Sequence, residues 1–203
     1  MVASANPDDP RPTWRLIRTA MRVVPHWLLR PIVELIQSLI LYRRRDAFDH
    51  NFPTHLGIHL WLEGVNADLY QQRLTAALDL FQLHAPVYLH WFRRRLPVIV
   101  VNQLFQIMPR PTELDLKRRV LAVRPQFAWT VPPETLAVAL VFQVTRARLG
   151  RRFSRKKTIV RVGKRMYAEA LAFARALPGQ EELVARWERA LAKYIERNPQ
   201  AAA

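Results

Sequence analysis

Residues 134–150 read ETLAVALVFQVTRARLG, directly after two prolines. Proline suits the first turn of a helix, a glutamate is favoured at the positive end of a helix, and a glycine commonly ends it. The stretch therefore predicts a helix that ends at Leu149–Gly150. The residues expected to pack this helix into a core are Leu136, Leu140, Val141 and Val144.

Three positions of this helix have the spacing of the two histidines and the glutamate in the zinc-binding pattern HExxH. In that pattern two imidazoles one helical turn apart bind zinc, and the glutamate between them activates a water molecule. This chain has Phe142, Gln143 and Arg146 there instead. Phe142 cannot bind a metal, Gln143 has the shape of glutamate but is not a base, and Arg146 carries a positive charge that repels a divalent ion. The quoted stretch alone leaves two interpretations, a core helix or a zinc helix that has lost its chemistry.

The sequence around these positions resembles an uncharacterised group of bacterial zincin-like proteins. The stretch PPETLAVALVFQVTRARL stands where that group has a helix close to ALVHEATHARL after a Pro-Glu start. The likeness continues in RVGKRMYAEALAFARALPGQEEL, where the group has a helix ending in AFAxxLPG, and it covers residues 42–192. The resemblance implies an α+β fold in which zincin-like helices surround a small sheet.

The resemblance also implies what has become of the zinc site. The two histidine positions fall on Phe142 and Arg146, the general base falls on Gln143, and the glutamate expected as third ligand falls on Gly163. Because all four residues differ from the pattern, the resemblance implies a pseudoenzyme without metal or cofactor that acts through binding. On this view Arg146 fills the former metal pocket with a charged group.

The rest of the chain predicts helices around a small sheet, in one domain over residues 46–198. Alternating apolar residues predict a strand at 56–62, and β-branched runs predict strands at 98–102 and 117–123. The Pro-rich segments 109–111 and 125–133 are expected to be connections. Further helices are expected at 67–83, with Asn66 as its cap, at 86–96, at 159–177, and from Pro178 to about residue 198.

The N-terminal region is predicted to be a disordered tail (1–12) followed by an amphipathic helical arm (13–45), and residues 199–203 form a second tail. Such an arm could lie on an anionic bilayer, or pack its apolar face on the domain or on another subunit. The chain opens without a secretory signal pattern, so a cytoplasmic location is expected, either free or at the inner membrane face. The residues of the arm that would meet a bilayer are Trp14, Arg15, Ile17, Arg18, Met21 and Arg22.

The formal net charge of +16 is the other prominent property of the chain. It favours an anionic partner such as nucleic acid, anionic lipid or an acidic protein, although an ordinary basic surface would give the same number. A second functional hypothesis is therefore a basic nucleic-acid or anionic-membrane binding module without enzyme ancestry. The loop expected to contact phosphates, or to be merely solvated, holds Arg151, Arg152, Arg155, Lys156 and Lys157.

Other catalytic chemistry has little support in the sequence. There is no cysteine, which excludes disulfides and thiolate sites, and no G-x-S-x-G or phosphate-binding loop. His55, His59 and Glu63 are spaced four residues apart and would share one face of a helix, where they could bind a metal. The alternating strand pattern separates them and favours ordinary surface residues.

Overall fold

A computed structural model describes residues 52–102, 105, 110–116, 119–149 and 156–199. The chain divides into two compact units, Met1–Asn51 and Phe52–Ala203. The predicted tail at 1–12, the arm at 13–45 and most of the tail at 199–203 lie outside the described residues. The same holds for Arg151, Arg152 and Arg155.

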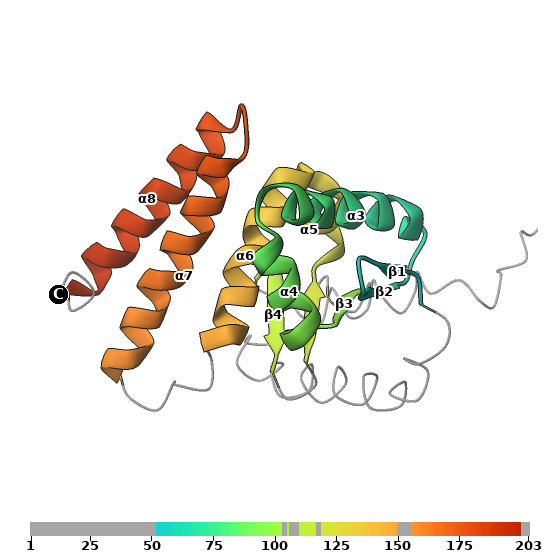
Figure 1. The fold of residues 1–203 in the computed structure, drawn as a ribbon, viewed down its shortest axis with the longest axis horizontal. Coiled ribbons are helices and arrows are strands. Elements are labelled where there is room, and N and C mark those ends of the chain that lie inside the picture. Colours follow the sequence, from blue (N-terminus) through green and yellow to red (C-terminus); the bar gives the residue numbers. More distant parts are fainter. Residues whose placement is uncertain (1–51, 103–104, 106–109, 117–118, 150–155, 200–203) are drawn as a thin grey trace, which may run out of the picture. The chain divides into compact units, whose positions relative to one another are not determined.

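Five strands form one mixed sheet in the order β1-β2-β3-β5-β4 (Figure 1). The inner strands β2, β3 and β5 run parallel to one another, whereas β1 pairs antiparallel with β2 and β4 pairs antiparallel with β5. The bounds are Thr54–His55 for β1, Ile58–Leu62 for β2, Val98–Val101 for β3, Thr112–Asp115 for β4 and Val120–Val123 for β5.

The sheet forms because the apolar runs of its central strands pair in register. Leu60 of β2 lies opposite Ile99 of β3, which in turn lies opposite Leu121 of β5. The three strands predicted from alternation and β-branching are therefore confirmed, with β5 shorter than the predicted segment. The strand residues that enter the hydrophobic core are Ile58, Leu60, Ile99, Val101, Leu121 and Val123.

The helix that contains the quoted stretch is the centre of the helical packing. It is α6, Pro133–Leu149, and it packs against α3, α4 and α7, while α8 packs against α7. Figure 1 shows α6, α7 and α8 side by side. The bounds of the other helices in the described part of the chain are Ala67–His84 for α3, Pro86–Arg95 for α4, Pro125–Thr130 for α5, Lys156–Ala176 for α7 and Glu181–Arg197 for α8.

The α+β class and all five predicted helices are confirmed, but four details were wrong. Residues 125–130 form helix α5 instead of a connection, and strands β1 and β4 were not predicted. Helix α7 begins at Lys156, so Lys156 and Lys157 belong to a helix and not to the loop before it. Asn66 occupies the N-cap position of α3, but its side chain makes no capping hydrogen bond. No helix among the described residues is long and apolar enough to span a bilayer.

Candidate functional site

Phe142, at the first histidine position of the pattern, belongs to an aromatic cluster between α6, α7 and α8. Its ring centre lies 5.0 Å from that of Tyr167 on α7 and 5.7 Å from that of Trp187 on α8. Tyr167 continues the contact to Tyr194 of α8, at 5.0 Å between ring centres. We call Phe142, Tyr167, Trp187 and Tyr194 the aromatic cluster. The position that would hold a metal ligand is therefore used to pack three helices together.

Gly163, at the third ligand position, lies directly against the last member of this cluster. A Cβ atom at residue 163 would stand 2.0 Å from the phenolic oxygen of Tyr194. That hydroxyl donates a hydrogen bond to the carbonyl oxygen of Val160, at 3.1 Å, which holds the ring in place. A glutamate at position 163 would have to displace Tyr194, so glycine here permits the close approach of α7 and α8.

Gln143, at the general-base position, is buried and contacts the sheet. Its side chain is 5% exposed, and its Nε2 donates a hydrogen bond to the Thr112 hydroxyl of β4, at 2.7 Å. Its Oε1 is buried and has no hydrogen-bond partner among the described residues. The amide therefore links the centre of α6 to the edge strand, a role that needs a neutral side chain because an unpaired carboxylate at this depth would be costly.

Arg146, at the second histidine position, is half-buried and interacts with charged residues around β4. Burial lowers the pKa of Arg146, the nearby charge of Arg110 lowers it further, and Glu113 opposes both effects. The space beside Gly163, which we expected Arg146 to fill, is occupied by Tyr194. The structure thus divides the four positions between two places. Phe142 and Gly163 lie at the aromatic cluster, whereas Gln143 and Arg146 interact with β4 and the residues beside it.

A carboxylate on α7 that the sequence did not single out organises the other side of α6. Glu169 accepts hydrogen bonds from the Thr145 hydroxyl, at 2.8 Å, from Nε of Arg165, at 2.9 Å, and from the Arg148 guanidinium. Arg148 also lies over the ring of Trp91 on α4, at 5.7 Å from the ring centre. Because these donors come from both α6 and α7, Glu169 links the two helices.

Tyr88 extends this network from α4, and its raised pKa predicts that the stability of the fold depends on pH. Burial, and then the negative charge of Glu169, raises the pKa of Tyr88 above its ordinary value. The unfolded chain releases this proton at about pH 10, before the folded chain does, so the folded state loses stability as pH rises above that point. We expect Tyr88→Phe to lose less stability between neutral pH and about pH 11 than the parent protein. Denaturant unfolding at both pH values tests this, and an unchanged loss would contradict it.

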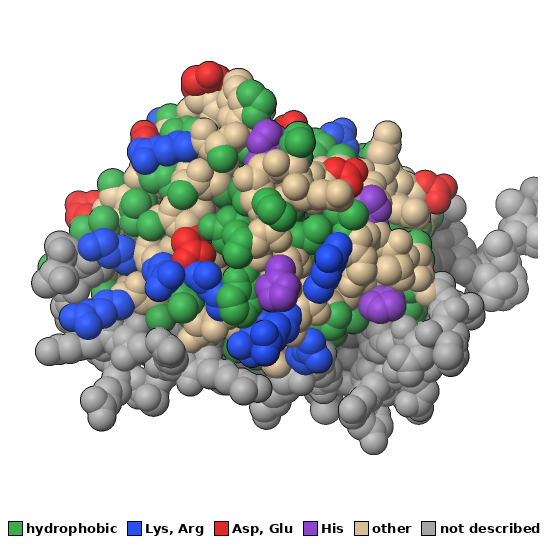
Figure 2. All heavy atoms as spheres, in the orientation of Figure 1, with side chains coloured by type: hydrophobic (Ala, Val, Ile, Leu, Met, Phe, Trp, Pro, Cys, Tyr) green, Lys and Arg blue, Asp and Glu red, His purple; other side chains and the backbone are tan. Residues whose placement is uncertain are grey.

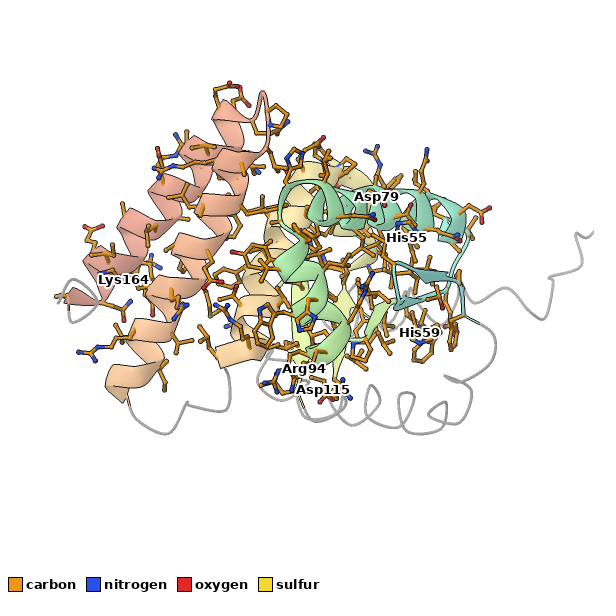
Figure 3. All side chains as sticks on the ribbon, in the orientation of Figure 1. His55, His59, Asp79, Arg94, Asp115 and Lys164 are labelled. Atoms are coloured by element: carbon orange, nitrogen blue, oxygen red, sulfur yellow. The ribbon has the colours of Figure 1, made fainter. Side chains whose placement is uncertain are left out.

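Within the described residues, His55, His59 and Glu63 each contact a different group. Nε2 of His55 lies 2.7 Å from a carboxylate oxygen of Asp79, and Figure 3 shows this pair apart from His59. His59 Nδ1 lies 3.2 Å from the Thr54 hydroxyl. Glu63 accepts hydrogen bonds from the Trp61 indole, at 2.7 Å, and from the Asn102 amide. No group of three or more His, Cys, Asp or Glu suited to a metal ion occurs within the described residues.

Comparison of the chain with known proteins returned no matching family model, no matching curated protein and no matching solved structure.

Proposed function

We propose that the chain is a catalytically inactive zincin-like protein that acts through binding. The observation that carries this proposal is the aromatic cluster, which occupies the space between the first and third ligand positions. Zinc needs nitrogen, sulfur or oxygen ligands that point into one common space. Phe142 offers no such atom, and Gly163 has no side chain and lies against Tyr194.

The remaining two positions support the same conclusion. A zinc-bound water is activated by a base that accepts its proton, and the amide of Gln143 accepts no proton at neutral pH. Its Nε2 already donates to Thr112, within the buried contact between α6 and β4. The guanidinium of Arg146 would repel a zinc ion instead of binding it. The helix is therefore better suited to holding the scaffold together than to hydrolysis.

The proposal includes a cytoplasmic location, either free or at the inner face of the membrane.

A hydrolysis assay tests the proposed loss of activity. The full chain, incubated with zinc and an unstructured protein substrate such as casein, is expected to release peptides no faster than a Gln143→Ala control prepared in the same way. Contaminating proteases would act equally in both preparations. Zinc-dependent release that disappears in the Gln143→Ala control would overturn the proposal.

A second candidate function is a basic nucleic-acid or anionic-membrane binding module without enzyme ancestry. The observation that favours it is the distribution of charge on the face drawn in Figure 2, where most lysines and arginines lie in the lower half and most acids in the upper half. This candidate expects binding to an anionic partner that weakens steeply as salt is added. On this view the residues at positions 142, 143, 146 and 163 do not derive from a zinc site.

A further inference from the structure

The central strands of the sheet carry apolar side chains on both faces. Successive side chains of a strand point to opposite faces, so the neighbours of Leu60, Ile99 and Leu121 point away from the core that these three residues enter. The pairing of β2, β3 and β5 places those neighbours level with one another. We call this side of the sheet the second face, and its apolar residues are Trp61, Val98, Val100, Val120 and Ala122.

The second face is largely buried, but it is separate from the main hydrophobic core. Trp61 is 1% exposed and Val100 0%. None of its five apolar residues belongs to the core on the other face, to which every described helix contributes buried side chains. Apolar runs such as VIVV and VLAV in parallel strands are typical of a sheet that is covered on both faces. The cover of the second face must therefore come from beyond these helices.

The N-terminal region joins the described residues beside the second face. The ring centre of Phe52, the first described residue, lies 5.7 Å from that of Trp61. Fully extended, residues 43–51 span at most about 30 Å. The four strands from β2 to β4 extend over only about 14 Å, because neighbouring strands lie about 4.8 Å apart. A segment that ends at Tyr42 can therefore reach every strand of the second face.

Residues 31–42, PIVELIQSLILY, have the pattern of a helix that packs on such a face. Pro31 suits the first turn of a helix. Glu34, Gln37 and Ser38 are three and four residues apart and share one side of the helix. A helix of this length is about 18 Å long, enough to cross the second face. The apolar residues on the side opposite Glu34 are Ile32, Ile36 and Leu39.

We propose that residues 31–42 form a helix that covers the second face and packs its apolar side against Val100 and the residues level with it. The sheet then has helices on both faces, the arrangement that parallel strands require. The proposal goes beyond the loss of hydrolysis and does not depend on it. It assigns this part of the arm to the fold and not to a bilayer, whereas the bilayer candidates, Trp14 to Arg22, precede the segment.

Thiol labelling of the full chain tests the proposal, because the chain has no cysteine of its own. Val100→Cys places a thiol on the second face, and Val101→Cys, in the same strand, places one on the core face as a matched control. Both thiols are expected to be protected from a maleimide reagent. Ile36→Asp/Leu39→Asp puts carboxylates on the apolar side of the segment and should speed labelling of the Val100→Cys thiol at least about tenfold, because buried charge is costly. The Val101→Cys thiol should stay protected.

A second pair of aspartates controls for the added charge. Gln37→Asp/Ser38→Asp introduces the same two carboxylates on the polar side of the segment. It should leave both labelling rates close to those of the chain with the unchanged segment. The same acceleration in both aspartate pairs would mean that charge, and not the loss of an apolar contact, exposes the second face, and this would contradict the proposal.

Other labelling results identify a different cover. Rapid labelling of Val100→Cys beside the unchanged segment would mean that the second face is open, so the proposal would be wrong. Protection that survives Ile36→Asp/Leu39→Asp would assign the cover to another part of the chain, or to a second copy if it weakens on dilution. If this variant exposes both thiols equally, it unfolds the whole unit, and the milder Ile36→Ala/Leu39→Ala pair decides. Equal labelling of the two thiols in that pair would also contradict the proposal.

Discussion

The Glu169→Ala variant is expected to lose about 3 kcal/mol of unfolding free energy. The substitution removes the carboxylate that pairs with Arg148, and it leaves the mostly buried Arg148 guanidinium without a compensating negative charge. The Glu169 side chain is 17% exposed and the Arg148 side chain 20%. The substitution also leaves the Thr145 hydroxyl without its acceptor. Because α4, α6 and α7 meet at this carboxylate, the loss should appear as a lower denaturant midpoint for the whole unit.

The exposed ion pair between Arg175 and Glu188 provides a matched control. Its atoms lie 2.6 Å apart, and the two side chains are 59% and 48% exposed. Surface pairs of this kind contribute at most about 1 kcal/mol, so Glu188→Ala should change stability by no more than that. Equal losses in Glu169→Ala and Glu188→Ala would show that burial of the carboxylate is not what makes Glu169 important.

Gly163→Ala is expected to destabilise the protein by about 1 kcal/mol, the lower end of the range found when extra atoms are forced into a close contact, because Gly163 and Tyr194 are only half-buried. The new methyl group would stand 2.0 Å from the Tyr194 oxygen and would push the ring away from Tyr167 and from the carbonyl of Val160. The free energy of unfolding is obtained from denaturant titrations. A glycine-to-alanine change in a helix with open space would have the opposite sign, because alanine is the better helix former.

The opposite sign expected without the clash provides the control for the Gly163→Ala measurement. In a Tyr194→Ala background the clash is absent, and Gly163→Ala should stabilise the helix by up to about 1 kcal/mol. The difference between the two backgrounds measures the contact between residues 163 and 194 directly. If Gly163→Ala has the same effect with and without Tyr194, the close contact is not what requires glycine at this position.

The sequence predicts the parts of this fold that local patterns determine. The run VIVV is β3, and the helical stretch after Pro133 is α6, because burial and turn chemistry act within a few residues. The segment TELD lacks an apolar run, and its strand, β4, exists through pairing with β5. The prolines of segment 125–133 predict a connection, but Pro125 stands in the first turn of α5, the part of a helix that tolerates proline.

In the candidate site too, the sequence predicts what depends on local residue types but not what depends on contacts between distant residues. That Phe142, Gln143 and Arg146 do not form a zinc site follows from the residue types alone. The contact between Gly163 and Tyr194 could not be predicted, because it joins residues 31 positions apart through the turn between α7 and α8. The network around Glu169 likewise needs the packing of α6 against α7, to which no spacing in the sequence points.

The measurement that tests the central claim most directly is the ratio of zinc to protein after equilibrium dialysis of the full chain. If residues 142, 143, 146 and 163 serve packing and not metal binding, the ratio should stay far below one and should not change in Gln143→Ala or Arg146→Ala. In the His55→Ala/His59→Ala variant, any zinc bound by these surface histidines is lost, so zinc that remains is bound elsewhere. A ratio near one that survives the histidine substitutions and falls in Gln143→Ala would contradict the account.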